Sequence, residues 1–152
     1  MERQHLDPVE RMLAERACER LAVELVHRLD LGEPSAVAEL FTPDGVWEWP
    51  DGDRRVVGRE ALAAYFGGRP ADRLSRRLVT NVRVDVHTPD AAEMTSYLTT
   101  FRVDGHRGEL SPAGPPVQVG HYRDTCERRD GAWLLARRTL HLAFAGVTPR
   151  VS

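Results

Sequence analysis

The chain has 152 residues, enough for one domain with a core and a pocket but too few for two, so we expect a single domain over residues 1–152. Its 21 basic and 23 acidic side chains give a formal net charge of -2, which disfavours nucleic acid as a partner. The apolar stretches are short and interrupted by charges, so we expect no membrane span and a cytoplasmic protein. The two cysteines, Cys18 and Cys126, are too few for a disulfide framework, and we expect buried thiols.

The first half of the chain predicts three helices. Apolar residues recur at every fourth position across residues 8–29, which is typical of an amphipathic helix. A second, short helix is expected at residues 35–41, before a turn at residues 42–45. A third helix is expected at residues 59–66, because Gly67 follows as a helix stop.

Five segments are expected to form strands, because they alternate polar and apolar residues or are rich in β-branched and aromatic residues. They are residues 46–49, 78–87, 93–103, 117–128 and 132–144. Residues 51–54 are interpreted as a hairpin tip, and turn residues separate the last four segments, which predicts four long antiparallel strands. Three helices followed by a curved sheet predict an α+β fold, in which the helices close one face of the sheet.

Four stretches of the sequence resemble one known family. They are LDLGEPSAVAELFTPDGVWEW, VGREALAAYF, RRLVTNVRVDV and GHYRDTCERRDGAWLLARR. They are similar to the SnoaL-like branch of the nuclear-transport-factor-2-like superfamily, which includes scytalone dehydratase, hexachlorocyclohexane dehydrochlorinase and polyketide cyclases. The resemblance implies a cone-shaped α+β domain, with N-terminal helices packed on a strongly curved, mixed, mostly antiparallel sheet around one apolar pocket. Because the superfamily also holds proteins without catalysis, the function depends on the pocket residues.

The resemblance assigns Asp30, at the end of the first predicted helix, to the catalytic aspartate of the dehydratase and dehydrochlorinase pattern, as a proton-transferring acid/base. The alternative is a solvated aspartate before the turn at Gly32. Arg77 stands where the similar enzymes have a histidine, and a guanidinium group is no general base because it keeps its proton in the working pH range. An Asp–Arg pair can instead hold an enolate or carboxylate oxygen, or orient a water. Strand alternation puts Arg77, Asn81 and Asp85 on one partly polar face, so a β-bulge or an outward Arg77 is an open alternative.

Other aromatic and ionisable residues are candidates for the pocket wall. Trp47 matches a pocket-lining tryptophan of the dehydrochlorinase-like pattern, with ordinary core packing as the alternative. A histidine ionises near neutral pH and can shuttle protons, so His141 is a candidate to replace the missing histidine, with His121 on the neighbouring predicted strand. We therefore predict catalytic roles for Asp30, Arg77 and His141. We predict substrate contacts for Trp47, Trp49, Tyr65, Asn81, Tyr97 and His121.

The sequence lacks the spacing of metal sites, phosphate-binding loops and nucleophile elbows, so we expect chemistry without a metal or cofactor. The first hypothesis is an enzyme of bacterial specialised metabolism that dehydrates, isomerises or cyclises a small apolar or polyketide-like molecule by proton transfer. The second is a non-catalytic ligand-binding or accessory module, and the third is a subunit that pairs with a larger enzyme. We also expect a homodimer formed by an exposed apolar sheet face, with Met94, Leu98 and Leu134 as candidate contacts.

Overall fold

The N-terminal segment forms one long helix, α1 (Pro8–Asp30), in the computed structural model, which describes residues 5–151. Its buried side chains do not follow the predicted stripe along the whole helix. A spacing of four residues turns by about 400° per step, about 40° more than one full turn, so the stripe drifts around the helix. Val9 and Leu13 are therefore exposed at its start, whereas Leu25 and Leu29 are buried at its end.

The segment after α1 folds into five short elements. They are η1 (Pro34–Leu40), β1 (Phe41–Trp49), η2 (Pro50–Gly52), β2 (Arg54–Val57) and α2 (Arg59–Gly67). The second predicted helix is a 3-10 helix, η1, and the third is confirmed as α2. The turn expected at residues 42–45 lies inside β1, where pairing with a neighbouring strand shifts register between Phe41 and Val46.

Four long strands form most of the sheet. They are β3 (Leu74–Thr88), β4 (Ala91–Val103), β5 (Gln118–Arg129) and β6 (Ala132–Ala145). The strand order is β2-β1-β6-β5-β4-β3, in which β1 and β6 run parallel and every other pair is antiparallel. The predicted mixed, mostly antiparallel sheet of an α+β fold is therefore confirmed. Strand β3 begins at Leu74 rather than at residue 78, which brings Ser75 and Arg77 into the sheet.

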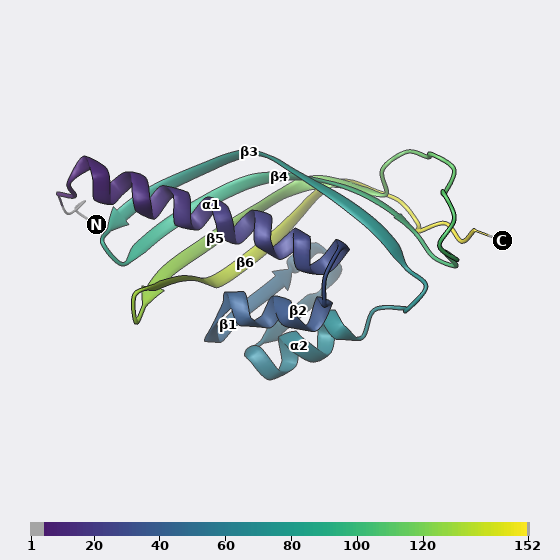
Figure 1. Ribbon diagram of the computed structural model, residues 1–152, viewed down its shortest axis with the longest axis horizontal. Helices are drawn as coiled ribbons and strands as arrows, with labels where there is room; N and C mark the ends of the chain where they lie inside the picture. Colours follow the sequence, from purple (N-terminus) through teal and green to yellow (C-terminus); the bar gives the residue numbers. More distant parts are fainter. Residues whose placement is uncertain (1–4, 152) are drawn as a thin grey trace.

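The long strands arch over α1, and the core lies between the helix and the inner face of the sheet (Figure 1). Met94 and Leu98 of β4 point into this core and are each 1% exposed, so the prediction that they form an exposed apolar face is wrong. Alternation along β4 puts their neighbours outside, where Tyr97 is 57% and Phe101 is 40% exposed. Leu134 is partly buried.

Both cysteines are free and buried, as predicted, and no helix within residues 5–151 is long and apolar enough to cross a membrane.

A β-bulge interrupts β3 and changes which residues face inward. Pairing with β4 shifts between Thr80 and Arg83, and Asn81 adopts a left-handed backbone with a φ of 55°. A shift of one residue exchanges the two faces of a strand, so Arg77 faces inward before the bulge and Val86 faces the core after it, while Arg83 is exposed. The polar face predicted for this strand is therefore broken at Asn81, which is itself exposed.

Candidate functional site

A cavity of about 330 Å³ opens between α1, β1, α2 and the inner face of the sheet. Its lining includes five aromatic residues, Trp47, Trp49, Tyr65, Phe66 and Tyr122. It also includes six arginines, Arg54, Arg69, Arg73, Arg77, Arg102 and Arg138. The pocket is therefore more polar than the apolar pocket that the resemblance implied, in which Arg77 was the one expected arginine. Larger hollows lie elsewhere on the described surface, but none of the predicted site residues lines them.

Four of the five aromatic residues come from two elements that hold predicted pocket residues, and Tyr122 comes from β5. Strand β1 supplies Trp47 and Trp49 on one face, and helix α2 supplies Tyr65 and Phe66. The ring of Trp47 lies 5.1 Å from that of Tyr65 and 6.0 Å from that of Phe66, measured between ring centroids. The structure thus places Trp47, Trp49 and Tyr65 at the cavity, where planar apolar groups of a ligand can stack.

The pair of Asp30 and Arg77 forms at the end of α1. The Ser75 hydroxyl donates to Asp30 Oδ1 at 2.7 Å, and the Arg77 backbone N–H donates to Asp30 Oδ2 at 2.7 Å. The Arg77 guanidinium also donates to Asp30 Oδ1, and both side chains are 6% exposed. The alternatives of a solvated Asp30 and an outward Arg77 are therefore excluded. Arg77 lines the cavity, whereas Asp30 lies behind it and is not part of the lining.

A second buried ion pair, which sequence analysis missed, lies on the inner face of β5 and β6. Arg138 donates to the two carboxylate oxygens of Asp124 at 2.8 and 2.9 Å, and neither residue is exposed. The guanidinium carbon of Arg138 lies 3.8 Å from the ring centroid of Tyr122. Among the described residues, Arg138 Nη1 and the indole N–H of Trp49 have no hydrogen-bond partner. The available signal was the alternation along β5, which puts Asp124 on the same face as Tyr122 and Cys126.

Three of the cavity arginines have no carboxylate partner within residues 5–151: Arg54, which donates to the Tyr65 hydroxyl at 3.4 Å, Arg69 and Arg102. Arg73 pairs with Asp104 at 2.8 and 3.1 Å, and these hydrogen bonds raise the pKa of Arg73 and lower that of Asp104. Within the described chain, Arg102 donates only to the Thr148 hydroxyl, at 2.8 Å, and Arg69 makes no hydrogen bond or ion pair. Burial, followed by repulsion from Arg77 and other arginines, lowers the pKa of Arg69 to about 10. Burial and arginine neighbours also lower the pKa of Arg102. Arginines keep their proton at neutral pH, so Arg69 and Arg102 both carry a positive charge that no carboxylate of the described chain matches.

Besides Asp30, which lies behind the lining, four predicted site residues lie outside the cavity. His121 and His141 are opposite each other on β5 and β6, with ring centroids 4.8 Å apart, and Tyr97 pairs with His121 on the same outer face. Their predicted placement in the pocket is wrong, as is that of Asn81 at the bulge of β3. For His141 the cause is a register shift near Leu135, which reverses the alternation along β6. Burial, then the neighbouring His141 and Arg123, lower the pKa of His121.

The described lining of the cavity contains no His, Asp, Glu or Cys. Across residues 5–151 there is also no group of three or more such residues that could hold a metal ion. The ionisable groups at the cavity wall are therefore arginines and tyrosines. They can stabilise negative charge on a ligand oxygen and donate hydrogen bonds to it.

Comparison with known proteins gives the family. The sequence profile of the SnoaL-like domain matches residues 10–139, and no protein with a curated description matches the sequence. A putative scytalone dehydratase from Novosphingobium aromaticivorans is 23% identical, with 91% of this chain and 89% of that chain covered and a TM-score of 0.75. A hexachlorocyclohexane dehydrochlorinase is 15% identical, with 93% of this chain and 96% of that chain covered and a TM-score of 0.74. A structure from Catenulispora acidiphila in complex with S-DNPA is 26% identical, with 86% and 94% covered and a TM-score of 0.67. The chain therefore belongs to the SnoaL-like family.

Proposed function

We propose that this chain is a cofactor-independent small-molecule enzyme that acts by proton transfer, as a dehydratase, isomerase or cyclase. The observation that supports this proposal is the Asp30–Arg77 pair, which is buried at the wall of a cavity with aromatic rings on its other side. The two enzymes named above, a putative dehydratase and a dehydrochlorinase, share the fold and favour chemistry of this class. In this proposal the reaction belongs to bacterial specialised metabolism and takes place in the cytoplasm.

The geometry gives the two members of the pair different parts. Arg77 lines the cavity and would stabilise the negative charge that develops on a substrate oxygen when a neighbouring C–H bond loses its proton. Asp30 accepts three hydrogen bonds, two of them from Arg77, and does not line the cavity, so it acts as a positioning residue for Arg77. The proton passes to a water molecule in the cavity, and the hydroxyls of Tyr65 and Tyr122 can donate hydrogen bonds to the same substrate oxygen.

The test is deuterium incorporation into 2-tetralone, a bicyclic ketone with acidic C–H bonds, followed by NMR in heavy water. We expect the wild-type chain to accelerate exchange, and Arg77→Gln and Tyr65→Phe to slow it by about a hundredfold, because each removes one catalytic group. Asp30→Asn should also slow it, through misplacement of Arg77. The matched control is His141→Gln on the outer face, which should leave the rate unchanged. Equal rates in wild type and Arg77→Gln would contradict the proposal.

A second function, a non-catalytic ligand-binding module, is favoured by one observation: no carboxylate, imidazole or thiol group lines the described cavity. The Catenulispora acidiphila complex with S-DNPA supports small-molecule binding in either case. A wild-type chain that binds 2-tetralone in calorimetry but exchanges none of its C–H bonds would favour this second function.

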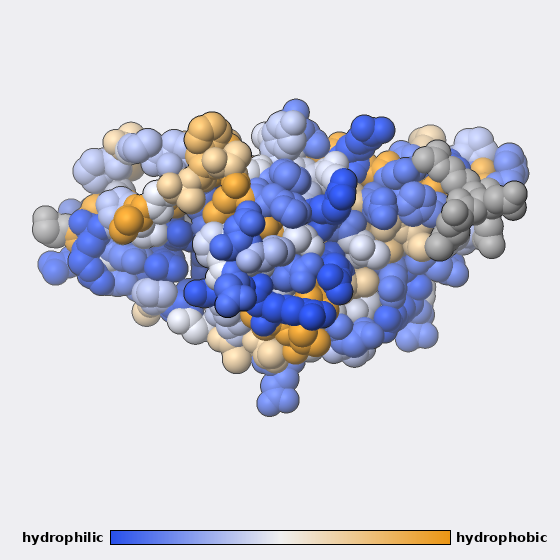
Figure 2. Space-filling model, turned by 180° about the vertical axis from the view of Figure 1, so that it is seen from behind, coloured by the Kyte–Doolittle hydropathy of each residue, from blue (hydrophilic) through white to orange (hydrophobic). Residues whose placement is uncertain are grey.

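We also propose a homodimer that forms through the outer face of the sheet. Leu78, Tyr97 and Phe101 are exposed there on neighbouring strands, in place of the buried residues that sequence analysis had named. On the side drawn in Figure 2 the surface is largely hydrophilic, with hydrophobic groups toward the C-terminal end and at the lower middle of the view. Light scattering at micromolar concentration should give twice the mass of 17.1 kDa, and a monomer mass would contradict the proposal.

A further inference from the structure

We propose that the cavity takes a small aromatic acid, whose anionic group is bound by Arg69 and Arg102 while its ring packs beside Trp47 and Tyr65. The anionic group is a carboxylate or an oxyanion of similar shape. This inference names the substrate class of the same cavity, and it rests on the proposed function only for what happens to the ligand once it is bound.

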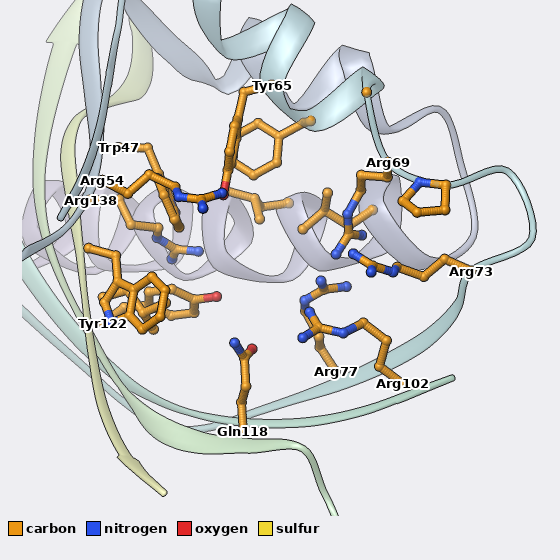
Figure 3. A pocket seen from close by; sticks show the side chains of 17 residues that line it. Trp47, Arg54, Tyr65, Arg69, Arg73, Arg77, Arg102, Gln118, Tyr122 and Arg138 are labelled. Carbon is orange, nitrogen blue, oxygen red and sulfur yellow. The ribbon is translucent and has the colours of Figure 1, made fainter. Parts of the chain in front are cut away.

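The first observation is an excess of positive charge on one side of the cavity. The guanidinium groups of Arg69, Arg73, Arg77 and Arg102 converge there, opposite the group formed by Trp47, Arg138 and Tyr122 (Figure 3). Two of these four arginines are neutralised, Arg73 by Asp104 and Arg77 by Asp30. Arg69 and Arg102 are not neutralised by any carboxylate in the part of the chain that the structure describes. The whole chain carries a net charge of -2, so this excess is a local feature of the cavity.

The second observation is that these two arginines are held together against their mutual repulsion. Both are partly buried, and repulsion by Arg73 and Arg77 adds to the effect of burial in lowering their pKa values. Unpaired, partly buried guanidinium groups do not increase the free energy of unfolding of a protein. A bound anion would supply the missing negative charge, and guanidinium groups match carboxylates because their N–H donors lie in one plane.

The third observation lies on the opposite side of the cavity. Arg138 is fully buried, and its Nη1 has no partner among the described residues, like the indole N–H of Trp49. Buried donors are almost always satisfied, so an acceptor oxygen of the ligand is expected beside them. The ring of Trp47 lies on this side as well, and the ring of Tyr65 lies next to it, with the two ring centroids 5.1 Å apart (Figure 3). The ligand that fits has an anionic group at one end, an aromatic body, and a hydroxyl or carbonyl oxygen at the other end.

The test is isothermal titration calorimetry of the full chain with 2-naphthoate and with its neutral isostere 2-naphthamide. Wild type should bind 2-naphthoate roughly tenfold more tightly or better, because charge-assisted hydrogen bonds are worth that much. The variant Arg69→Gln/Arg102→Gln should lose this preference and bind 2-naphthamide as before. The matched control is Arg123→Gln/Arg107→Gln, which removes the same charge from exposed positions and should keep the preference.

Circular dichroism establishes first that the cavity variant is folded. If it is not, Arg69→Gln alone carries the test, because this side chain makes no hydrogen bond or ion pair in the described chain, and it should lower the preference about threefold. Equal affinity of wild type for both probes, an unchanged preference in the cavity variant, or no binding of 2-naphthoate at millimolar concentration would each overturn the inference. A preference for 2-naphthoate without any deuterium exchange into 2-tetralone would support this inference and contradict the proposed enzyme. Failure of the inference can therefore be told apart from failure of the proposed function.

Discussion

Asp124→Asn tests the buried ion pair that forms part of the cavity wall. The substitution keeps the shape of the side chain and removes its charge, which leaves the guanidinium of Arg138 uncompensated in a site where neither residue is exposed. Breaking a buried pair in this way costs about 3–5 kcal/mol. Domains of this size are stable by about 5–15 kcal/mol, so the loss is a large fraction of the free energy of unfolding. At about 2–4 °C per kcal/mol, the melting temperature should fall by about 6–20 °C.

The assay is urea unfolding at pH 7, followed by tryptophan fluorescence and circular dichroism. The matched control is Asp44→Asn, which removes the same charge from an exposed pair with Arg129, where Asp44 is 75% exposed, and which should change stability little. The double variant Asp124→Leu/Arg138→Met should lose less stability than Asp124→Asn, because it leaves no unpaired charge. A loss below about 1 kcal/mol for Asp124→Asn would refute the reasoning, since it would mean that Arg138 is solvated from the cavity.

Three further predictions concern other parts of the molecule. Trp47→Ala should destabilise the fold by about 3–5 kcal/mol in urea unfolding and weaken 2-naphthoate binding, because the ring is 8% exposed and faces the cavity. An unchanged free energy of unfolding together with an unchanged affinity for 2-naphthoate would contradict this placement of the ring. Arg69→Gln should leave the melting temperature unchanged or raise it, since it relieves repulsion; a clear fall would show a partner that we have not identified. The pKa of His121 is lowered in the fold, so the unfolded chain binds its proton more readily, and stability should fall as the pH drops through the ordinary histidine range. His121→Gln should flatten that dependence between pH 7.5 and about 5.5, and an equally steep one would contradict this assignment.

Much of the architecture could be predicted from the sequence, because hydrophobic periodicity and turn residues mark it directly. The helices at residues 8–29 and 59–66 and the four long strands match the observed elements within a few residues. Asp30 and Arg77 could be brought together only through the resemblance, since 47 positions separate them along the chain. Their contact depends on β3 starting at Leu74, earlier than its alternation of residues indicated.

The errors in the candidate site come from two irregular strands. The alternation of residues predicts which side chains face inward only as long as the strand is regular. The prediction fails beyond a residue that bulges out, as at Asn81 in β3 and near Leu135 in β6. The second irregularity moved His141 from the predicted pocket to the outer face. No local pattern marks such a bulge in advance, because it depends on pairing with the next strand.

The arginine-rich side of the cavity had a weak signal in the sequence. Arg69, Arg73 and Arg77 recur at every fourth position, but they follow the end of α2, so the spacing does not reflect one helix face. Arg102 comes from another strand, and only the curvature of the sheet brings it to the same place. A net charge of -2 for the whole chain concealed this local excess of positive charge.

The most direct test of the cavity as the ligand site is a crystal structure of the chain with 6-hydroxy-2-naphthoate. We predict the carboxylate within about 3 Å of guanidinium nitrogens of Arg69 and Arg102, and the ring beside Trp47. The hydroxyl oxygen should lie beside Arg138 Nη1 or the indole N–H of Trp49. A ligand bound on the outer face beside Tyr97, or in the cavity with its carboxylate away from both Arg69 and Arg102, would contradict the account.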